Sequence, residues 1–73
     1  MQSVGIIGAG YWGKNLVRSF NTLQTVQLKY VADTSGDILK KISQDYPHVQ
    51  ALTDYTTIIE DQDITAVVIC TPA

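Results

Sequence analysis

Three glycines with the spacing G-x-G-x-x-G constrain this chain more than any other feature. They lie in the stretch VGIIGAGYWGKN and are Gly8, Gly10 and Gly13. The apolar run before them, residues 4–7, is typical of a short β-strand that ends at Gly8. Because the same spacing also occurs in turns that bind nothing, its meaning depends on the elements on either side.

The residues that follow the glycines change to a helical pattern. Apolar side chains recur at positions i, i+1, i+4 and i+7 and form one stripe of a helix: Leu16, Val17, Phe20 and Leu23. A second apolar run, residues 26–33 (VQLKYVAD), predicts a strand. Strict alternation would place four of its side chains on one face, namely Val26, Leu28, Tyr30 and Ala32, with Lys29 and Val31 on the other.

A second helix is expected after this strand, with Ser35 as its N-cap and Pro47 just past its end. Its buried stripe consists of Ile38, Leu39, Ile42 and Tyr46. VQAL (residues 49–52) predicts a short strand, and Thr53 or Asp54 is expected to cap a brief helix that holds Tyr55, Ile58 and Ile59. AVVIC (residues 66–70) predicts a last, wholly apolar strand, typical of a sheet covered on both faces.

The predicted order is therefore β-α-β-α-β-α-β. Strands that alternate with helices indicate parallel pairing through right-handed crossovers. This pattern predicts an α/β fold, the first half of a doubly wound parallel sheet with the strand order 3-2-1-4.

In this context the glycines are typical of a pyrophosphate-binding loop. Gly8 is expected to make the tight turn off the strand, Gly10 to admit the pyrophosphate, and Gly13 to let the helix approach the sheet. The free N–H groups around Tyr11 and Trp12, in the first helical turn, would point at the phosphates. A glycine-rich turn without a ligand is the alternative.

An acidic residue at the end of the second strand supports the same interpretation. Asp33 stands 20 residues after Gly13, where the dinucleotide fingerprint places an acid that hydrogen-bonds the adenosine ribose. A carboxylate there repels the 2′-phosphate of NADP, and no arginine follows in DTSGD. NAD is thus the expected cofactor, with NADP less favoured. The alternative is that Asp33 only caps the turn into the second helix.

The end of the last strand borders the same crevice. In a 3-2-1-4 sheet the strand order reverses between the first and fourth strands, and ligands bind at their carboxyl ends. Thr71 and Pro72 would thus lie near the middle and nicotinamide portion of the cofactor, although a plain strand-ending turn explains them equally well.

Several other residues carry weaker signals. Cys70 is interpreted as a small buried residue, because no base accompanies it in the sequence, and His48 is expected to be exposed. Lys14 is interpreted as part of a solvated face, and Gly5 as a point of close packing between the first strand and the first helix.

Composition excludes several classes of function. The net charge is −2, and the five basic residues are too scattered to neutralise nucleic-acid phosphates: Lys14, Arg18, Lys29, Lys40 and Lys41. Cys70 is the only cysteine, which excludes an intrachain disulfide and favours a reducing, cytoplasmic setting. No run resembles a signal peptide or approaches the roughly 20 apolar residues of a membrane span, so we expect no membrane partner.

Together these stretches resemble a known family. VGIIGAGYWGKN, VADTS, the YP at residues 46–47 and LTDYTTIIEDQDITAVVICTPA are similar to the N-terminus of Gfo/Idh/MocA-type oxidoreductases over essentially the whole chain. The resemblance implies an NAD(P)-binding Rossmann domain followed by an α/β substrate domain. It also implies hydride transfer between nicotinamide and a hydroxyl carbon of a sugar, cyclitol or sugar nucleotide.

By position, the resemblance assigns residues to the cofactor but none to catalysis. The three glycines match the phosphate loop with Tyr11 and Trp12 inside it, Asp33 matches the ribose acid, and Thr71 and Pro72 match the turn beside the nicotinamide ribose. The family's E-K-P motif, its catalytic histidine or aspartate and its substrate domain would all lie beyond Ala73.

We therefore expect residues 1–73 to be the N-terminal portion of a dinucleotide-binding domain, inactive alone, from an NAD(P)-dependent oxidoreductase. A non-catalytic, NAD(H)-sensing regulatory module is the alternative. A whole dinucleotide-binding domain needs a second half; without it, the run AVVIC would be an exposed edge strand that invites association, for example as a homo-oligomer.

Overall fold

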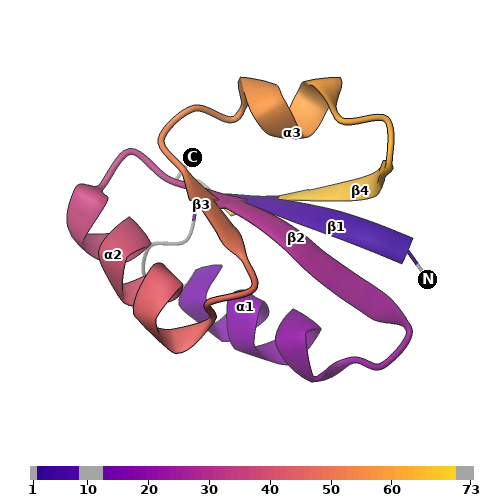
Figure 1. Cartoon of the computed structure of the whole chain (residues 1–73), viewed down its shortest axis with the longest axis horizontal. Coiled ribbons are helices and arrows are strands. Elements are labelled where there is room, and N and C mark those ends of the chain that lie inside the picture. Colours follow the sequence, from indigo (N-terminus) through magenta and orange to yellow (C-terminus); the bar gives the residue numbers. More distant parts are fainter. Residues whose placement is uncertain (1, 9–12, 71–73) are drawn as a thin grey trace.

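The computed structural model describes residues 2–8 and 13–70. Helices and strands alternate along this part of the chain: β1 (Gln2–Ile7), α1 (Gly13–Thr22), β2 (Val26–Ala32), α2 (Gly36–Asp45), β3 (Gln50–Leu52), α3 (Thr56–Glu60) and β4 (Ile64–Ile69). Every strand pair is parallel, and the sheet has the order β3-β2-β1-β4 (Figure 1). The predicted fold class and strand order are confirmed.

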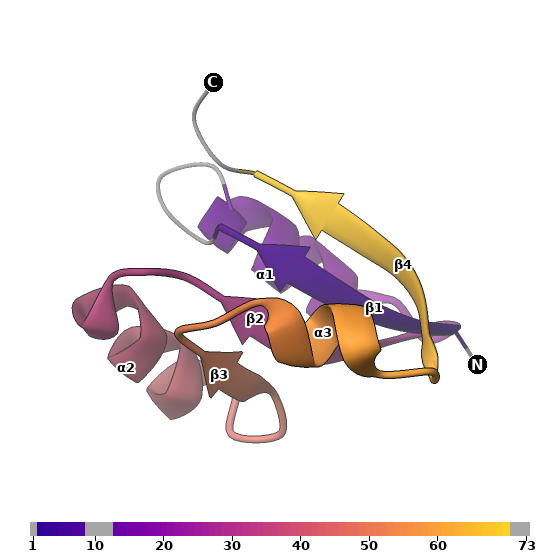
Figure 2. The ribbon, with the colours of Figure 1, turned by 90° about the horizontal axis from the view of Figure 1, so that it is seen from above.

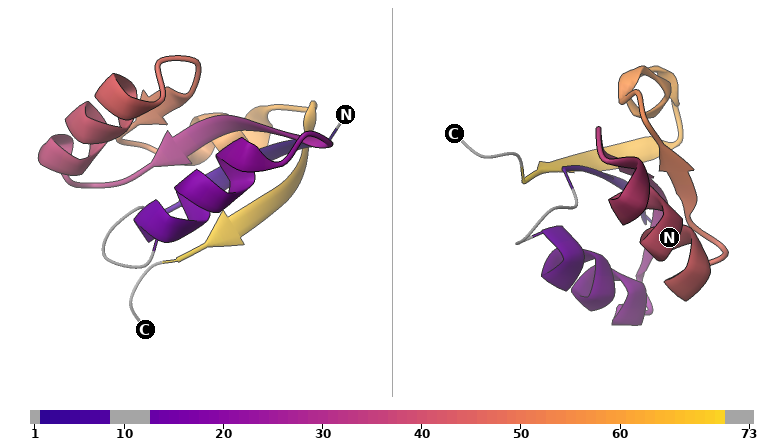
Figure 3. Two further views of the ribbon diagram at one scale, coloured as in Figure 1. Left: turned by 90° about the horizontal axis from the view of Figure 1, so that it is seen from below. Right: turned by 90° about the vertical axis from the view of Figure 1, so that its left-hand side faces the viewer.

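The helices form layers on the two faces of the sheet. α1 and α2 lie on one face and α3 lies on the other (Figure 3). The larger apolar core belongs to the α1 and α2 side and consists of Ile6, Val17, Leu28, Val31, Ile42 and Val49. The smaller core belongs to the α3 side and consists of Tyr30, Ala32 and Ile58.

A β-bulge in β2 overturns the predicted alternation of its side chains. Val4 of β1 pairs with Leu28, but the next residue, Gly5, pairs with Tyr30, so Lys29 is an extra residue on β2. Since one inserted residue shifts the alternation by one, Leu28 packs in the larger core while Tyr30 packs in the smaller one. The prediction that Leu28 and Tyr30 share a face is wrong.

The close packing at Gly5 also differs from its prediction. A Cβ atom at Gly5 would lie 2.6 Å from Cγ2 of Ile58. Ile58 belongs to α3 and not to α1, so the glycine admits the helix on the opposite face. Gly5 is a point of close approach, as predicted, but the predicted partner helix is wrong.

The predicted ends of several elements shift by one or two residues. Leu23 lies beyond the end of α1 and is 49% exposed, so it is not part of the buried stripe. Val49 is buried but precedes β3, and β4 begins at Ile64, ahead of the predicted start at residue 66.

The N-cap of α2 follows local side-chain chemistry, whereas the N-cap of α3 is Tyr55, which makes no side-chain capping hydrogen bond, so the predicted cap at Thr53 or Asp54 is wrong. Oγ of Ser35 accepts a hydrogen bond from the N–H of Ile38, which confirms Ser35 as the N-cap of α2. Asp54 precedes α3, and its Oδ1 accepts hydrogen bonds from both the N–H and the hydroxyl of Thr56. These two hydrogen bonds lower the pKa of the Asp54 carboxyl, the hydroxyl contributing most.

Candidate functional site

Three backbone hydrogen bonds join the carboxyl ends of all four strands. The N–H of Cys70, after β4, donates to the carbonyl of Ile7 in β1 at 2.8 Å. The N–H of Gly8 donates to Ala32 at 2.7 Å, and the N–H of Asp33 donates to Leu52 at 3.0 Å. These bonds extend the sheet one residue past each of β1, β2 and β4, so Gly8, Asp33 and Cys70 lie at the same end of the sheet. Figure 2 shows β1 and β4 side by side with both arrowheads at this end.

Gly8 has the backbone conformation that the turn off β1 requires. Its φ is 87°, and it is the one glycine with positive φ among the residues that the structure describes. A side chain at this φ is strained because its Cβ crowds the neighbouring carbonyl oxygen. The predicted role of Gly8 in the turn is therefore supported by its conformation.

α1 presents its N-terminus after this turn. α1 is described from Gly13, and its first turn contains no acidic side chain, while the first turn predicted around Tyr11 and Trp12 lies outside the described residues. The positive end of the helix dipole is therefore not offset by a carboxylate of its own first turn, which favours an anion there. Five predicted site residues lie outside the described residues: Gly10, Tyr11, Trp12, Thr71 and Pro72.

Asp33 lies at the same carboxyl end of the sheet, after the strand next to β1. It is half-buried directly after β2, and its Oδ1 accepts a hydrogen bond from the N–H of Ser35 at 2.8 Å. This contact fixes the carboxylate against the turn into α2. The turn-capping role is thus real, and Asp33 also directly follows Ala32, whose carbonyl accepts the N–H of Gly8, at the strand end where the fingerprint places a ribose acid. The two roles are compatible, since a carboxylate accepts hydrogen bonds at both oxygens.

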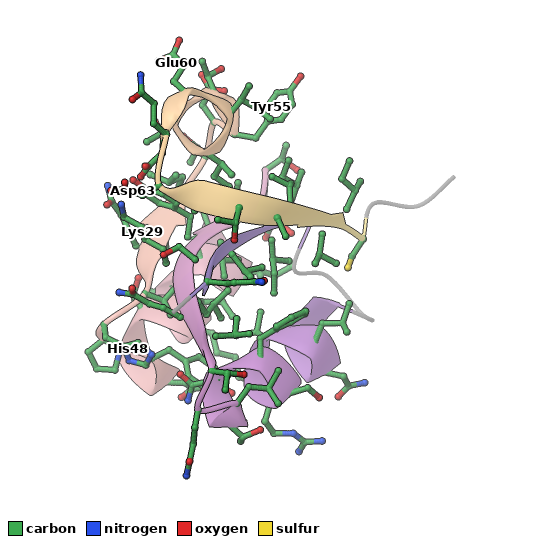
Figure 4. All side chains as sticks on the ribbon, turned by 90° about the vertical axis from the view of Figure 1, so that its right-hand side faces the viewer. Lys29, His48, Tyr55, Glu60 and Asp63 are labelled. Carbon is green, nitrogen blue, oxygen red and sulfur yellow. The ribbon has the colours of Figure 1, made fainter. Side chains whose placement is uncertain are left out.

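A charged cluster at the opposite end of the sheet was not predicted. Oδ2 of Asp61 accepts hydrogen bonds from Nζ of Lys29 at 2.6 Å and from the hydroxyl of Tyr30 at 2.5 Å. Figure 4 shows Lys29 beside Asp63, at the end where β4 begins, away from the carboxyl ends of the strands. The one sequence signal for this cluster was the lone lysine inside the apolar run VQLKYVAD.

The cluster shifts three pKa values in the directions that favour its contacts. The Lys29 hydrogen bond, followed by the Tyr30 hydrogen bond, lowers the pKa of Asp61 to about 2. The hydrogen bond to Asp61 raises the pKa values of both Lys29 and Tyr30. Because the cluster ties the bulge of β2 to the end of α3 and lies far from Gly8 and Asp33, we assign it to the fold.

The structure also places the two other residues considered in the sequence, His48 and Cys70. His48 is exposed, and its Nε2 lies 2.6 Å from Oδ1 of Asn21. Cys70 is half-buried against the larger core.

In residues 2–8 and 13–70, no group of three or more His, Cys, Asp or Glu side chains is arranged to hold a metal ion. None of the helices in these two ranges is long and apolar enough to cross a membrane.

Comparison with family models identifies the chain. Residues 2–73 match the model of the Gfo/Idh/MocA oxidoreductase family, described as an NAD-binding Rossmann fold. The chain belongs to this family. Its sequence is also 31% identical over 68 residues to the uncharacterized oxidoreductase YrbE of Bacillus subtilis (strain 168), covering 93% of this chain and 20% of YrbE.

Several solved structures share the fold of this chain. A candidate myo-inositol dehydrogenase from Sinorhizobium meliloti 1021 superposes with a TM-score of 0.86 and 30% identity, covering 99% of this chain and 21% of that protein. Scyllo-inositol dehydrogenase from Lactobacillus casei, with bound NAD(H) and scyllo-inositol, gives a TM-score of 0.82 at 24% identity, covering 99% of this chain and 22% of that protein. Structures that share the fold have been solved with NAD(H) and with NADP. The chain spans about a fifth of the length of these relatives.

Proposed function

We propose that this chain forms the part of an NAD(P)-dependent oxidoreductase that binds the adenosine and pyrophosphate of the cofactor. The observation that carries the proposal is the hydrogen bond from the N–H of Gly8 to the carbonyl of Ala32, the residue just before Asp33. It places the left-handed glycine turn and the acid on adjacent strands at the carboxyl end of the sheet. Dinucleotides bind at this end in doubly wound folds.

The described residues fit the two ends of an ADP moiety. The turn at Gly8 leads into α1, whose N-terminal N–H groups suit phosphate, and a first turn without acidic side chains leaves that preference intact. Asp33 supplies a carboxylate that accepts hydrogen bonds from ribose hydroxyls. Gly10, Tyr11, Trp12 and Gly13 complete the proposed phosphate loop, and Thr71 and Pro72 would border the nicotinamide ribose. When bound, the nicotinamide supplies the acceptor or donor of a hydride.

Asp33 also carries the proposal that NAD is preferred over NADP. A carboxylate held at the end of β2 repels a 2′-phosphate, and no arginine follows it within DTSGD to accept one.

We propose further that the reaction of the intact protein oxidises or reduces a hydroxyl carbon of a sugar, cyclitol or sugar nucleotide. The support is family membership together with a structural neighbour that holds scyllo-inositol. None of residues 1–73 is assigned to catalysis, so this portion of the dinucleotide-binding domain is proposed to be inactive by itself.

NADH titration tests the proposed cofactor site. Trp12 is the only tryptophan in the chain and lies within the glycine motif, so its fluorescence is the natural reporter. We expect NADH to change this fluorescence and to raise the melting temperature, because a ligand that binds only the folded chain stabilises it. If saturating NADH changes neither quantity, the chain does not bind the cofactor.

Two aspartate variants separate a specific role from a general effect of charge. Asp33→Ala should weaken NADH binding and narrow the preference for NADH over NADPH. Asp37→Ala removes the same charge from an exposed position in the first turn of α2 and should leave both quantities nearly unchanged. Equal effects of the two variants would reduce Asp33 to a turn cap.

A further inference from the structure

Asp33 is tied both to β3 and to the start of α2, across the short turn that follows β2 (Figure 1). Its N–H donates to the carbonyl of Leu52 in β3 at 3.0 Å, which fixes the main chain at the end of β2. Its Oδ1 accepts a hydrogen bond from the N–H of Ser35 at 2.8 Å, two residues further on. The sheet therefore holds the backbone of Asp33, while Ser35 holds its carboxylate.

Ser35 is itself fixed by α2. Its Oγ accepts a hydrogen bond from the N–H of Ile38 at 3.4 Å, and its carbonyl accepts one from the N–H of Leu39 at 3.1 Å. Leu39 is buried, and Ile38 packs against the larger core, so apolar contacts anchor the first turns of this helix. The donor that orients the carboxylate of Asp33 thus belongs to the cap of a packed helix.

We propose that Ser35 is a positioning residue for the choice of cofactor, an inference that rests on the proposed function of Asp33. The N–H of Ser35 fixes the carboxylate in the orientation that receives the ribose hydroxyls of NAD and opposes the 2′-phosphate of NADP. A side chain that is already oriented loses less freedom when the ribose binds, so the affinity for NADH is higher. A carboxylate released from Ser35 can rotate away from a 2′-phosphate, so the preference for NADH is weaker.

The two contacts of Ser35 can be removed separately. Its N–H contacts Asp33, and its hydroxyl caps α2. Ser35→Ala removes only the hydroxyl, whereas Ser35→Pro removes both the hydroxyl and the N–H. The φ of Ser35 is −89°, near the value of about −65° that proline imposes, so proline requires only a small adjustment of the main chain. Comparison of the two variants therefore isolates the hydrogen bond to Asp33.

An ester in place of the amide between Thr34 and Ser35 provides a second variant. It replaces the N–H by an oxygen, which cannot donate a hydrogen bond, and it leaves both side chains in place. The chain has 73 residues and is short enough for chemical synthesis. Because the ester keeps the hydroxyl cap of α2 and does not restrict φ as proline does, it tests the proposal even if Ser35→Pro fails to fold.

Titrations with NADH and with NADPH, followed by Trp12 fluorescence, give two affinities whose ratio measures the preference. Ser35→Pro should bind NADH about two- to tenfold more weakly than Ser35→Ala, and the ester should show a similar loss relative to the unmodified chain. In both comparisons the ratio should move toward one. Ser35→Ala should lower the melting temperature through the lost cap but leave the ratio unchanged. A purely structural role of Ser35 would weaken both cofactors alike.

An Asp33→Ala background shows whether Ser35 acts through the carboxylate. In this background Ser35→Pro and Ser35→Ala should give the same ratio, because the group that the N–H orients is gone. A narrowing by Ser35→Pro that persists there would overturn the inference.

The same measurements separate this inference from the proposed function. If Asp33→Ala by itself leaves the ratio unchanged, Asp33 is not the ribose acid, and the role of Ser35 falls with it. If Asp33→Ala narrows the ratio but the ester does not, Asp33 keeps its proposed role and Ser35 is only the cap of α2.

Discussion

Gly5 of β1 lies directly against Ile58 of α3, so that a Cβ atom at Gly5 would be 2.6 Å from Cγ2 of Ile58. Ile58 is 1% exposed and packs with Tyr30 and Ala32 in the smaller core. Gly5→Ala should therefore destabilise the fold by about 1–3 kcal/mol through overpacking. Urea denaturation followed by circular dichroism measures this loss.

Gly36→Ala is the matched control for this variant. No atom lies within 4 Å of a Cβ at Gly36, which is the first residue of α2. Alanine also favours the helix, so stability should stay the same or rise by up to about 1 kcal/mol. A similar loss in both variants would show that the contact with Ile58 is not the cause.

Asp61 is expected to contribute more to stability than its neighbour Asp63. Asp61→Asn weakens the hydrogen bonds that Lys29 and Tyr30 donate, and the Asp61 side chain is only 14% exposed. Asp63→Asn removes an equal charge, but that side chain is 83% exposed and lies 3.8 Å from Lys29. The denaturation midpoint should fall clearly for Asp61→Asn and little for Asp63→Asn. Equal shifts would indicate a general effect of charge.

The same carboxylate predicts a specific loss of stability in acid. The pKa of Asp61 is lowered to about 2 in the folded chain, whereas an unfolded aspartate titrates near 3.9. The unfolded state therefore binds the proton first as the pH falls. The stabilisation by Asp61 is complete above about pH 4 and is lost between about pH 4 and pH 2. Melting temperatures across this range should fall less steeply for Asp61→Asn than for the unmodified chain.

The order of the strands followed from the sequence because it depends on a pattern that repeats along the chain. Apolar runs of strand length alternate with helical stripes, and parallel crossovers leave few topologies for that order. The faces of β2 did not follow, because the bulge at Lys29 depends on long-range contacts. Lys29 reaches Asp61, 32 residues away, and a periodicity argument contains no information about such a pair.

Around the candidate site, too, local features were predicted from the sequence and long-range contacts were not. Gly8 and Asp33 were predicted from spacing, since the turn and the strand end are local features that topology brings together. The hydrogen bond from Ser35 to Asp33 also lies within reach of local reasoning. The partner helix of Gly5 was not predictable, because glycine removes the side chain whose polarity would indicate which face it lies on.

Two leucines that look alike in the sequence should respond very differently to truncation. Leu28 is 3% exposed in the larger core, and Leu28→Ala should cost about 2–5 kcal/mol. Leu23 is 49% exposed beyond α1, and Leu23→Ala should change stability by no more than about 0.5 kcal/mol. Since the bulge at Lys29 lets Leu28 and Val31 share this core, a small loss for Leu28→Ala would contradict the register of β2. Denaturant midpoints of the two variants provide the comparison.

The left-handed turn at Gly8 should depend on the backbone preference of the residue there. With φ at 87°, Gly8→Ala should destabilise the chain by about 1–2 kcal/mol, because a Cβ crowds the carbonyl oxygen in this region. Asparagine enters the left-handed region more readily than alanine, so Gly8→Asn should cost less although its side chain is larger. Thermal and urea unfolding of both variants measure the difference. An equal or larger loss for Gly8→Asn would mean that side-chain volume, and not backbone conformation, requires the glycine at this turn.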